Sequence, residues 1–228
     1  MRRAFARVGL PFALSVVTVA SLAVARAAPP QPTSPSALVR RQSQSVLAVL
    51  NRAYHTHALR GPGFDHTVLA LERIVLPYFD IPLTGDYVLG RYARSSTPAA
   101  RARFDHVFMV YLVNQLADAL RDYHGGHVVV IPYRGRRTAH YALVRTHVYQ
   151  PSGKEVAVNY SMVRTPEGWK LFDVSVEGVS YVMSYRQQFA PILASGGIPA
   201  LVTQLEAKLR KEHAVPVVLP HAASGGGR

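Results

Sequence analysis

The chain has 228 residues, of which 49% are hydrophobic, and it carries a formal net charge of +13 at pH 7. This length allows one large core or two small ones. Because the chain has no cysteine, disulfides are excluded and burial alone must hold the fold together.

The first 27 residues have the pattern of a cleavable secretion signal. A positive region from Arg2 to Arg7 precedes 18 uncharged residues (8–25), and Ala25-Arg26-Ala27 supplies the small residues that a signal peptidase needs. A membrane anchor is the alternative reading, since 18 residues approach a spanning length. Pro11 within the apolar run and the alanines at its end favour cleavage, so we expect an exported, soluble protein.

The charge indicates anionic partners. Removing the four arginines of the signal leaves +9, which attracts anions over a long range. For an exported chain these are anionic lipid headgroups or acidic proteins, and no nucleic acid is expected. The basic residues form no dense cluster in the sequence, so general adaptation to an acidic or salty medium would give the same charge.

Residues 36–124 are predicted to be helical, after a disordered leader over residues 28–35. Apolar residues at three- and four-residue intervals indicate helices over 36–59, from 66 to Pro77 and over 86–92. The clearest helix begins at Pro98, with the hydroxyl of Thr97 as its cap, and it ends before a pair of glycines at 125–126.

Residues 127–177 are predicted to form an antiparallel sheet. Four segments rich in Val, Tyr and Thr are separated by turn signals containing Gly and Pro, at residues 127–133, 139–149, 155–164 and 169–177. Short turns between strands favour an antiparallel meander with one buried face.

Two more helices are predicted over residues 181–212, followed by a loose tail over 213–228. The first helix ends at Gly196-Gly197, and the second opens at Pro199. The predicted architecture is therefore α+β: a curved antiparallel four-stranded sheet wrapped by helices, with a helical subdomain, in one domain over residues 36–212.

The histidine pairs do not indicate a metal site. His55 and His57 form one close pair and His124 and His127 another, but neither has a carboxylate at the spacing of known zinc sites. Both pairs lie at predicted helix ends, where the helix dipole favours histidine. Ser180 lacks the glycine of a nucleophile elbow, and no phosphate-binding or dinucleotide-binding motif occurs.

Asp173 and Glu177 are the remaining candidates for catalysis. They lie four residues apart on the last predicted strand, on the side that also carries Trp169, Leu171 and Ser175. Facing an apolar cavity, Asp173 would be a general base of the isomerase kind. The other side of the strand, with Phe172, Val174 and Val176, looks like the buried side. We therefore expect the two carboxylates to lie on the outer face or to cap backbone, and we expect a binding protein rather than an enzyme.

The residues from Gly168 to Phe189 resemble the toluene-tolerance family, whose best-known members are MlaC-type periplasmic phospholipid carriers. The strings that carry the resemblance are GWKLFDVSVEGVS at 168–180, YRQQF at 185–189, LPYFD at 76–80, VLGRY at 88–92, STP at 96–98, and Gly197 with Leu201 and Leu205. The resemblance covers residues 38–210.

This resemblance implies a sheet of the nuclear-transport-factor-2-like kind and a pocket for lipid acyl tails. It also implies a location in the periplasm of a double-membraned bacterium and phospholipid as cargo, with no other cofactor and no catalytic residue. The implied partners are an outer-membrane lipoprotein–porin complex and an inner-membrane ABC transporter with an MCE domain. Tyr92 and the pair Met183-Ser184 depart from the family pattern, which keeps a hopanoid lipid open as the alternative cargo.

The residues that fit the pocket are apolar ones on the chosen strand faces and on the long helix. They are Val107, Tyr111, Leu116, Val156, Val158, Tyr160, Met162, Phe172, Val174, Val176 and Val179. The choice of face rests on strict alternation, and a shift of one residue would invert it.

Overall fold

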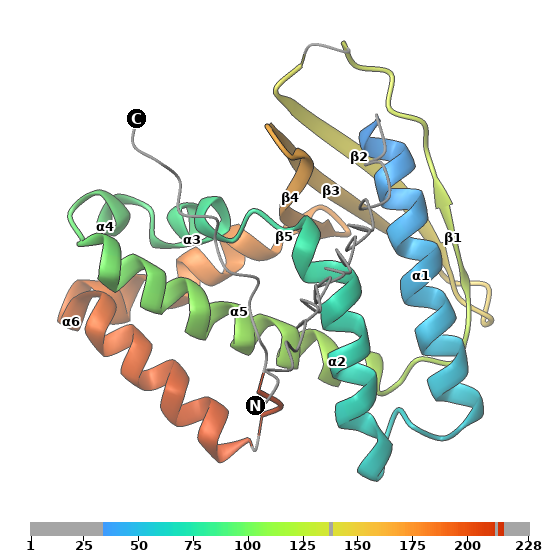
Figure 1. Ribbon diagram of the computed structural model, residues 1–228, viewed down its shortest axis with the longest axis horizontal. Coiled ribbons are helices and arrows are strands. Elements are labelled where there is room, and N and C mark those ends of the chain that lie inside the picture. The colour runs from blue at the N-terminus through green and yellow to red at the C-terminus, as the bar shows by residue number, and fades with distance from the viewer. Residues whose placement is uncertain (1–33, 137–138, 213, 217–228) are drawn as a thin grey trace, which may run out of the picture. The chain divides into compact units, whose positions relative to one another are not determined.

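The computed structural model describes residues 34–136, 139–212 and 214–216 (Figure 1). The predicted signal sequence and residues 28–33 of the predicted leader lie outside these ranges. Within them, no helix combines the length and the apolar character that a membrane span requires.

The N-terminal half is helical, as the sequence predicts. Its α-helices are α1 (Pro35–His55), α2 (Phe64–Val75), α3 (Ile81–Leu89), α4 (Arg91–Arg94) and α5 (Pro98–Leu120), with 3₁₀ turns η1 at Gly61–Gly63 and η2 at Leu76–Tyr78. The predicted cap of the long helix is confirmed, because the Thr97 hydroxyl accepts a hydrogen bond of 3.2 Å from the backbone N–H of Ala100.

The helix predicted over residues 86–92 is instead two helices. The first of them, α3, begins at Ile81, before the predicted start at residue 86. Asp80 caps it, since its carboxylate accepts a hydrogen bond of 3.1 Å from the backbone N–H of Leu83. Gly90 then separates α3 from α4, with a φ of 57° and a ψ of −123° that an L-residue rarely adopts.

In the described residues, the sheet has five strands rather than the predicted four. They are β1 (His127–Val130), β2 (Tyr141–Tyr149), β3 (Glu155–Thr165), β4 (Gly168–Val176) and β5 (Val179–Ser180). Neighbours in chain order pair antiparallel throughout, so the predicted meander is confirmed. The extra strand follows a two-residue turn at Glu177 and Gly178, both with positive φ, which brings the chain back along β4.

A bulge between β3 and β4 changes which residues of β4 face inward. Tyr160 lies opposite Val174, but Met162 lies opposite Leu171, so β4 has one residue more than β3 in this interval. Phe172 therefore lies on the outer face, where its ring stacks on Tyr87 at 5.2 Å between centroids. The prediction that Phe172 faces inward with Val174 and Val176 is wrong, because alternation does not continue through a bulge.

The inner face of the sheet is covered by α1 over β1 and β2. Leu38 and Val39 of α1 pack with Val144, Met162 and Trp169 of the sheet. In Figure 1, α1 runs along the side of β1 and β2, whereas α5 and α6 pack against each other in the helical part.

The last helix, α6 (Tyr181–Lys211), consists of two helical segments that meet at a kink. Gly197 lies at the kink with a φ of 64° and a ψ of −163°, and Pro199 follows it. The predicted break between two C-terminal helices is therefore confirmed. Val182, Phe189 and Leu201 of α6 pack with Phe104 and Phe108 of α5 to form the helical core.

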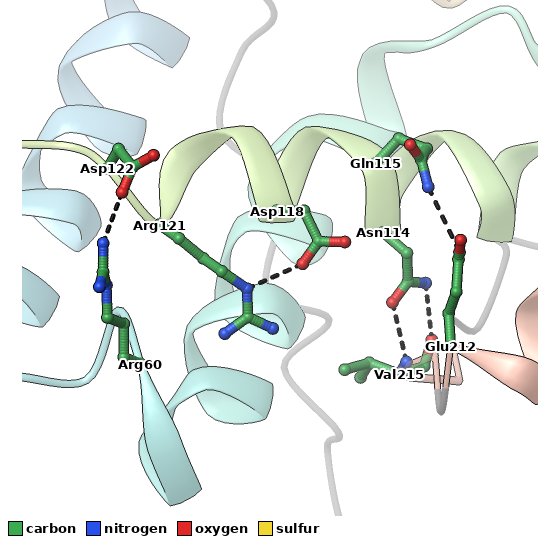
Figure 2. Close-up of polar contacts among 8 residues, drawn as sticks. All are labelled: Arg60, Asn114, Gln115, Asp118, Arg121, Asp122, Glu212 and Val215. Carbon is green, nitrogen blue, oxygen red and sulfur yellow. Dashed lines mark hydrogen bonds and ion pairs between the residues drawn. The ribbon is translucent and has the colours of Figure 1, made fainter.

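The described residues that follow α6 pack against the helical part of the protein and are not loose. The side chain of Asn114 accepts a hydrogen bond of 2.8 Å from the Val215 N–H and donates one of 3.0 Å to the Val215 carbonyl (Figure 2). The Val215 side chain is 6% exposed and packs against Phe64, Val68 and Ala117. The prediction of a loose tail from residue 213 is wrong for residues 214–216, since a buried amide pairs with their backbone. Residues 217–228 lie outside the described part.

Candidate functional site

Four valines on the inner face of β3 and β4 are only partly buried. Val158 lies opposite Val176 in the register, and Val156 and Val174 point to the same side of the sheet. All four are half-buried, whereas Val144 on the same face of β2 is fully buried. Because α1 covers the β1–β2 half, the β3–β4 half offers an apolar surface that the described helices leave partly open.

A hollow of about 330 Å³ continues from this surface toward α6. Its size lies at the lower end of the range for small-molecule sites. Val179 and Tyr181 are 62% and 42% exposed, so the hollow opens to the surface at the start of α6. The residues that line it are Val176, Val179, Tyr181, Ser184, Tyr185 and Gln188.

Tyr185 forms the wall between this hollow and the helical core. Its ring contacts those of Phe108 and Tyr111 edge-on, at 5.3 and 5.8 Å between centroids. Burial, together with a smaller effect of the neighbouring hydroxyls of Tyr111 and Tyr181, raises the pKa of the Tyr185 hydroxyl to about 12. The hydroxyl is therefore neutral at ordinary pH, and the side chain serves as an apolar wall with a polar tip.

The structure brings most of the predicted strand residues to one face. Val156, Val158, Tyr160, Met162, Val174 and Val176 share the inner face, and Val176 and Val179 line the hollow. Met162 is 2% exposed and fills the core under α1.

The predicted residues of α5 lie elsewhere. Val107 and Tyr111 are buried in the core between α5 and α6, and Tyr111 accepts a hydrogen bond of 2.9 Å from the Lys208 ammonium group. Leu116 is 48% exposed. Tyr111 contacts Tyr185, which lines the hollow.

The sequence reasoning missed the residues that α6 contributes. Tyr181, Ser184, Tyr185 and Gln188 follow each other at the spacing i, i+3, i+4, i+7, which places them on one face of a helix. That spacing was the available signal, but periodicity alone does not say that this face turns toward the end of β4.

Asp173 has a structural role. Its two carboxylate oxygens accept hydrogen bonds of 2.7 Å from the Ser180 hydroxyl and 3.1 Å from the Val182 N–H. It lies opposite Ser161 on the outer face of the sheet, away from the half-buried valines. Glu177 likewise accepts a hydrogen bond of 2.5 Å from the Ala157 N–H. The expectation that these carboxylates lie on the outer face or cap backbone is confirmed.

No metal centre is visible in the part of the chain that the structure describes. Within it, no three or more His, Asp or Glu side chains gather at distances that would hold a metal ion. His55 lies at the last turn of α1, and His127 begins β1.

Comparisons with known proteins place these features in a family. The family model described as "MlaC protein" matches residues 42–207. The intermembrane phospholipid transport system binding protein MlaC of Haemophilus influenzae is 23% identical over 200 residues, which cover 86% of this chain and 89% of that protein. The toluene tolerance protein ttg2D of Pseudomonas putida is 28% identical over 132 residues, or 56% of this chain and 60% of that protein.

A solved structure has the same fold. The phospholipid-binding protein of Ralstonia solanacearum, determined in complex with a phospholipid, superposes with a TM-score of 0.69 at 25% identity. The match covers 77% of this chain and 97% of that one.

Proposed function

Because the chain belongs to the MlaC protein family, with most of its length matched by the family model, we propose that it is a periplasmic phospholipid carrier. In this proposal residues 1–27 direct export and are removed. The mature protein then holds the acyl tails of one phospholipid and shuttles the lipid between a lipoprotein–porin complex of the outer membrane and an MCE-containing ABC transporter of the inner membrane.

The observation that carries the proposal is the apolar surface that continues from the inner face of β3 and β4 into the hollow beside α6. Val156, Val158, Val174 and Val176 are half-buried there, and Val179 extends the surface to the mouth. Apolar surface that the protein's own elements leave partly open is typical of a binding site. The hollow of about 330 Å³ is small for two acyl tails, so the proposal assigns the tails to the valine surface and the hollow together.

Elementary energetics support a carrier that works with partners. Each methylene removed from water contributes about 0.8 kcal/mol, so two tails of ~15 carbons are held by roughly 20 kcal/mol relative to water. Spontaneous release into water is therefore negligibly slow. A lipid that moves from a bilayer to the protein loses the hydrophobic free energy of the bilayer and regains a similar amount in the protein. The net free energy of this transfer is therefore close to zero. Its direction must come from the partner complexes, and the carrier needs no catalytic residue.

Identification of the bound lipid tests the proposal. The full chain is produced with its own signal in a double-membraned bacterium, isolated from the periplasm, and analysed by native mass spectrometry. We expect the mass of the chain from about residue 28 plus that of one phospholipid, and lipid extraction then identifies the headgroup. A hopanoid mass would replace phospholipid as the cargo. Bare protein after a gentle preparation would contradict the carrier function.

A further inference from the structure

A second hollow, of about 460 Å³, gathers arginines that are far apart in the sequence. Arg91 and Arg94 come from α4, Arg101 from the first turns of α5, and Arg186 from α6. In Figure 1, α4 lies at one end of the helical part, beside α6. The remaining lining residues are Asp86, Gly90 and Ala93.

The positive charge of this hollow is not compensated by the carboxylates around it. Among the described residues, Asp86 is the one acidic residue that lines it. In the described ranges, no carboxylate oxygen lies within 4.0 Å of any of the four guanidinium groups. Asp105 interacts electrostatically with Arg101, but burial raises the pKa of its carboxyl to about 7, so it carries only part of a charge at neutral pH.

Two of these arginines make hydrogen bonds to neutral groups. Arg101 donates hydrogen bonds of 2.8 and 3.3 Å to the carbonyls of Ala93 and Ser96. Arg91 donates to the Tyr92 hydroxyl at 3.0 Å, with its guanidinium carbon 5.1 Å from the centre of that ring. These partners are uncharged, so they leave the positive charge of the two side chains in place.

Arg186 lies directly against the backbone of Gly90. A Cβ at this glycine would come within 2.7 Å of Nη2 of Arg186 and would displace the guanidinium group, and the φ of 57° strains any other residue at this position. The backbone break between α3 and α4 thus sets one wall of the hollow. The planar donor fork of arginine matches phosphate oxygens, which accept two of its hydrogen bonds at once.

We propose that this arginine hollow binds a phosphate group, either free phosphate or the phosphate of an anionic lipid headgroup in a bilayer. The hollow is separate from the acyl-tail site, since Tyr185 lines the first hollow and Arg186, on the next position of α6, lines the second. The proposal goes beyond lipid carriage and rests on the convergence of the four arginines and on their uncompensated charge.

Two binding experiments on the purified chain test the site and distinguish the two sources. Calorimetric titration with sodium phosphate, against sodium chloride at equal ionic strength, measures free phosphate. Flotation with phosphatidylglycerol vesicles, against phosphatidylcholine vesicles, measures the headgroup. We expect Arg94→Gln and Arg186→Gln each to weaken binding about tenfold, which equals about 1.4 kcal/mol.

Arg210→Gln is the matched control, because Arg210 is an exposed arginine near the end of α6 and outside the hollow. It removes the same charge, and binding should change less than about twofold, as expected for a distant exposed charge. Arg186→Lys keeps the charge but loses the planar fork, so its binding should fall between those of the wild type and Arg186→Gln.

The outcomes separate clearly. Phosphate binding with this variant pattern supports the site with free phosphate as ligand, and vesicle binding alone with the same pattern supports the headgroup. Absence of binding in both arms, or equal weakening by Arg210→Gln, overturns the proposal. Lipid loading of Arg186→Gln, followed by native mass spectrometry, should stay unchanged, so failure here is distinguishable from failure of the carrier function.

Discussion

Val158→Arg is the sharpest test of the acyl-tail site. Val158 lies on β3 opposite Val176, in the half-buried part of the inner face. A guanidinium group there must stay hydrated, so it excludes the methylenes that would otherwise cover the valine. Displacing four methylenes removes about 3 kcal/mol of binding at 0.8 kcal/mol each. Since transfer from a bilayer is close to balance, the ratio of loaded to empty protein should fall by roughly 150-fold.

Leu143→Arg provides the matched control for this substitution. Leu143 lies on β2 on the outer face of the same sheet, and it is 45% exposed. The control introduces the same side chain into the same sheet without touching the inner face. Native mass spectrometry measures the loaded fraction, release of a fluorescent phospholipid from vesicles measures transfer, and circular dichroism confirms the fold. Equal loading of Val158→Arg and the wild type would refute the assignment, and so would equal losses in both variants.

Two further substitutions test the carboxyl groups. The Asp105 carboxyl has a pKa raised to about 7, first by burial and then by Asp86 and Asp80, against the opposing effect of Arg101. The folded state therefore binds an extra proton between about pH 4 and pH 7, and the stability of the protein falls as the pH rises through that window. Asp105→Asn should raise the free energy of unfolding at pH 8, by at most about 4 kcal/mol, and should change it little at pH 4. Chemical denaturation at both pH values measures this, and no gain at pH 8 would contradict the buried carboxyl. Asp173→Ala should lower the free energy of unfolding by about 2–3 kcal/mol, because the Ser180 hydroxyl and the Val182 N–H lose a charged acceptor. Lipid loading per folded molecule should stay the same, and a loss of loading without a loss of stability would instead assign Asp173 to the site.

Local chemistry in the sequence determined most of the elements of this protein. The charge and apolar pattern of residues 1–27 indicates export by itself, although those residues lie outside the described ranges. The Thr97 cap of α5 and the break of α6 at Gly197 are recognisable because capping and chain reversal depend on residues a few positions apart. The same holds for the strands of the meander, whose turns are rich in Gly and Pro.

The composition of both hollows was decided only by the tertiary structure. Pairing between β3 and β4 contains a bulge, so Phe172 turns outward and the inner face cannot be extrapolated by alternation. Tyr181 and Tyr185 of α6 line the first hollow because Asp173 of β4 accepts a hydrogen bond from the Val182 N–H and so holds the start of α6 against that strand. The arginine hollow collects side chains from three helices that are up to 95 residues apart, from Arg91 to Arg186. Periodicity in a sequence specifies which residues share a face of one element, whereas long-range packing decides what that face meets.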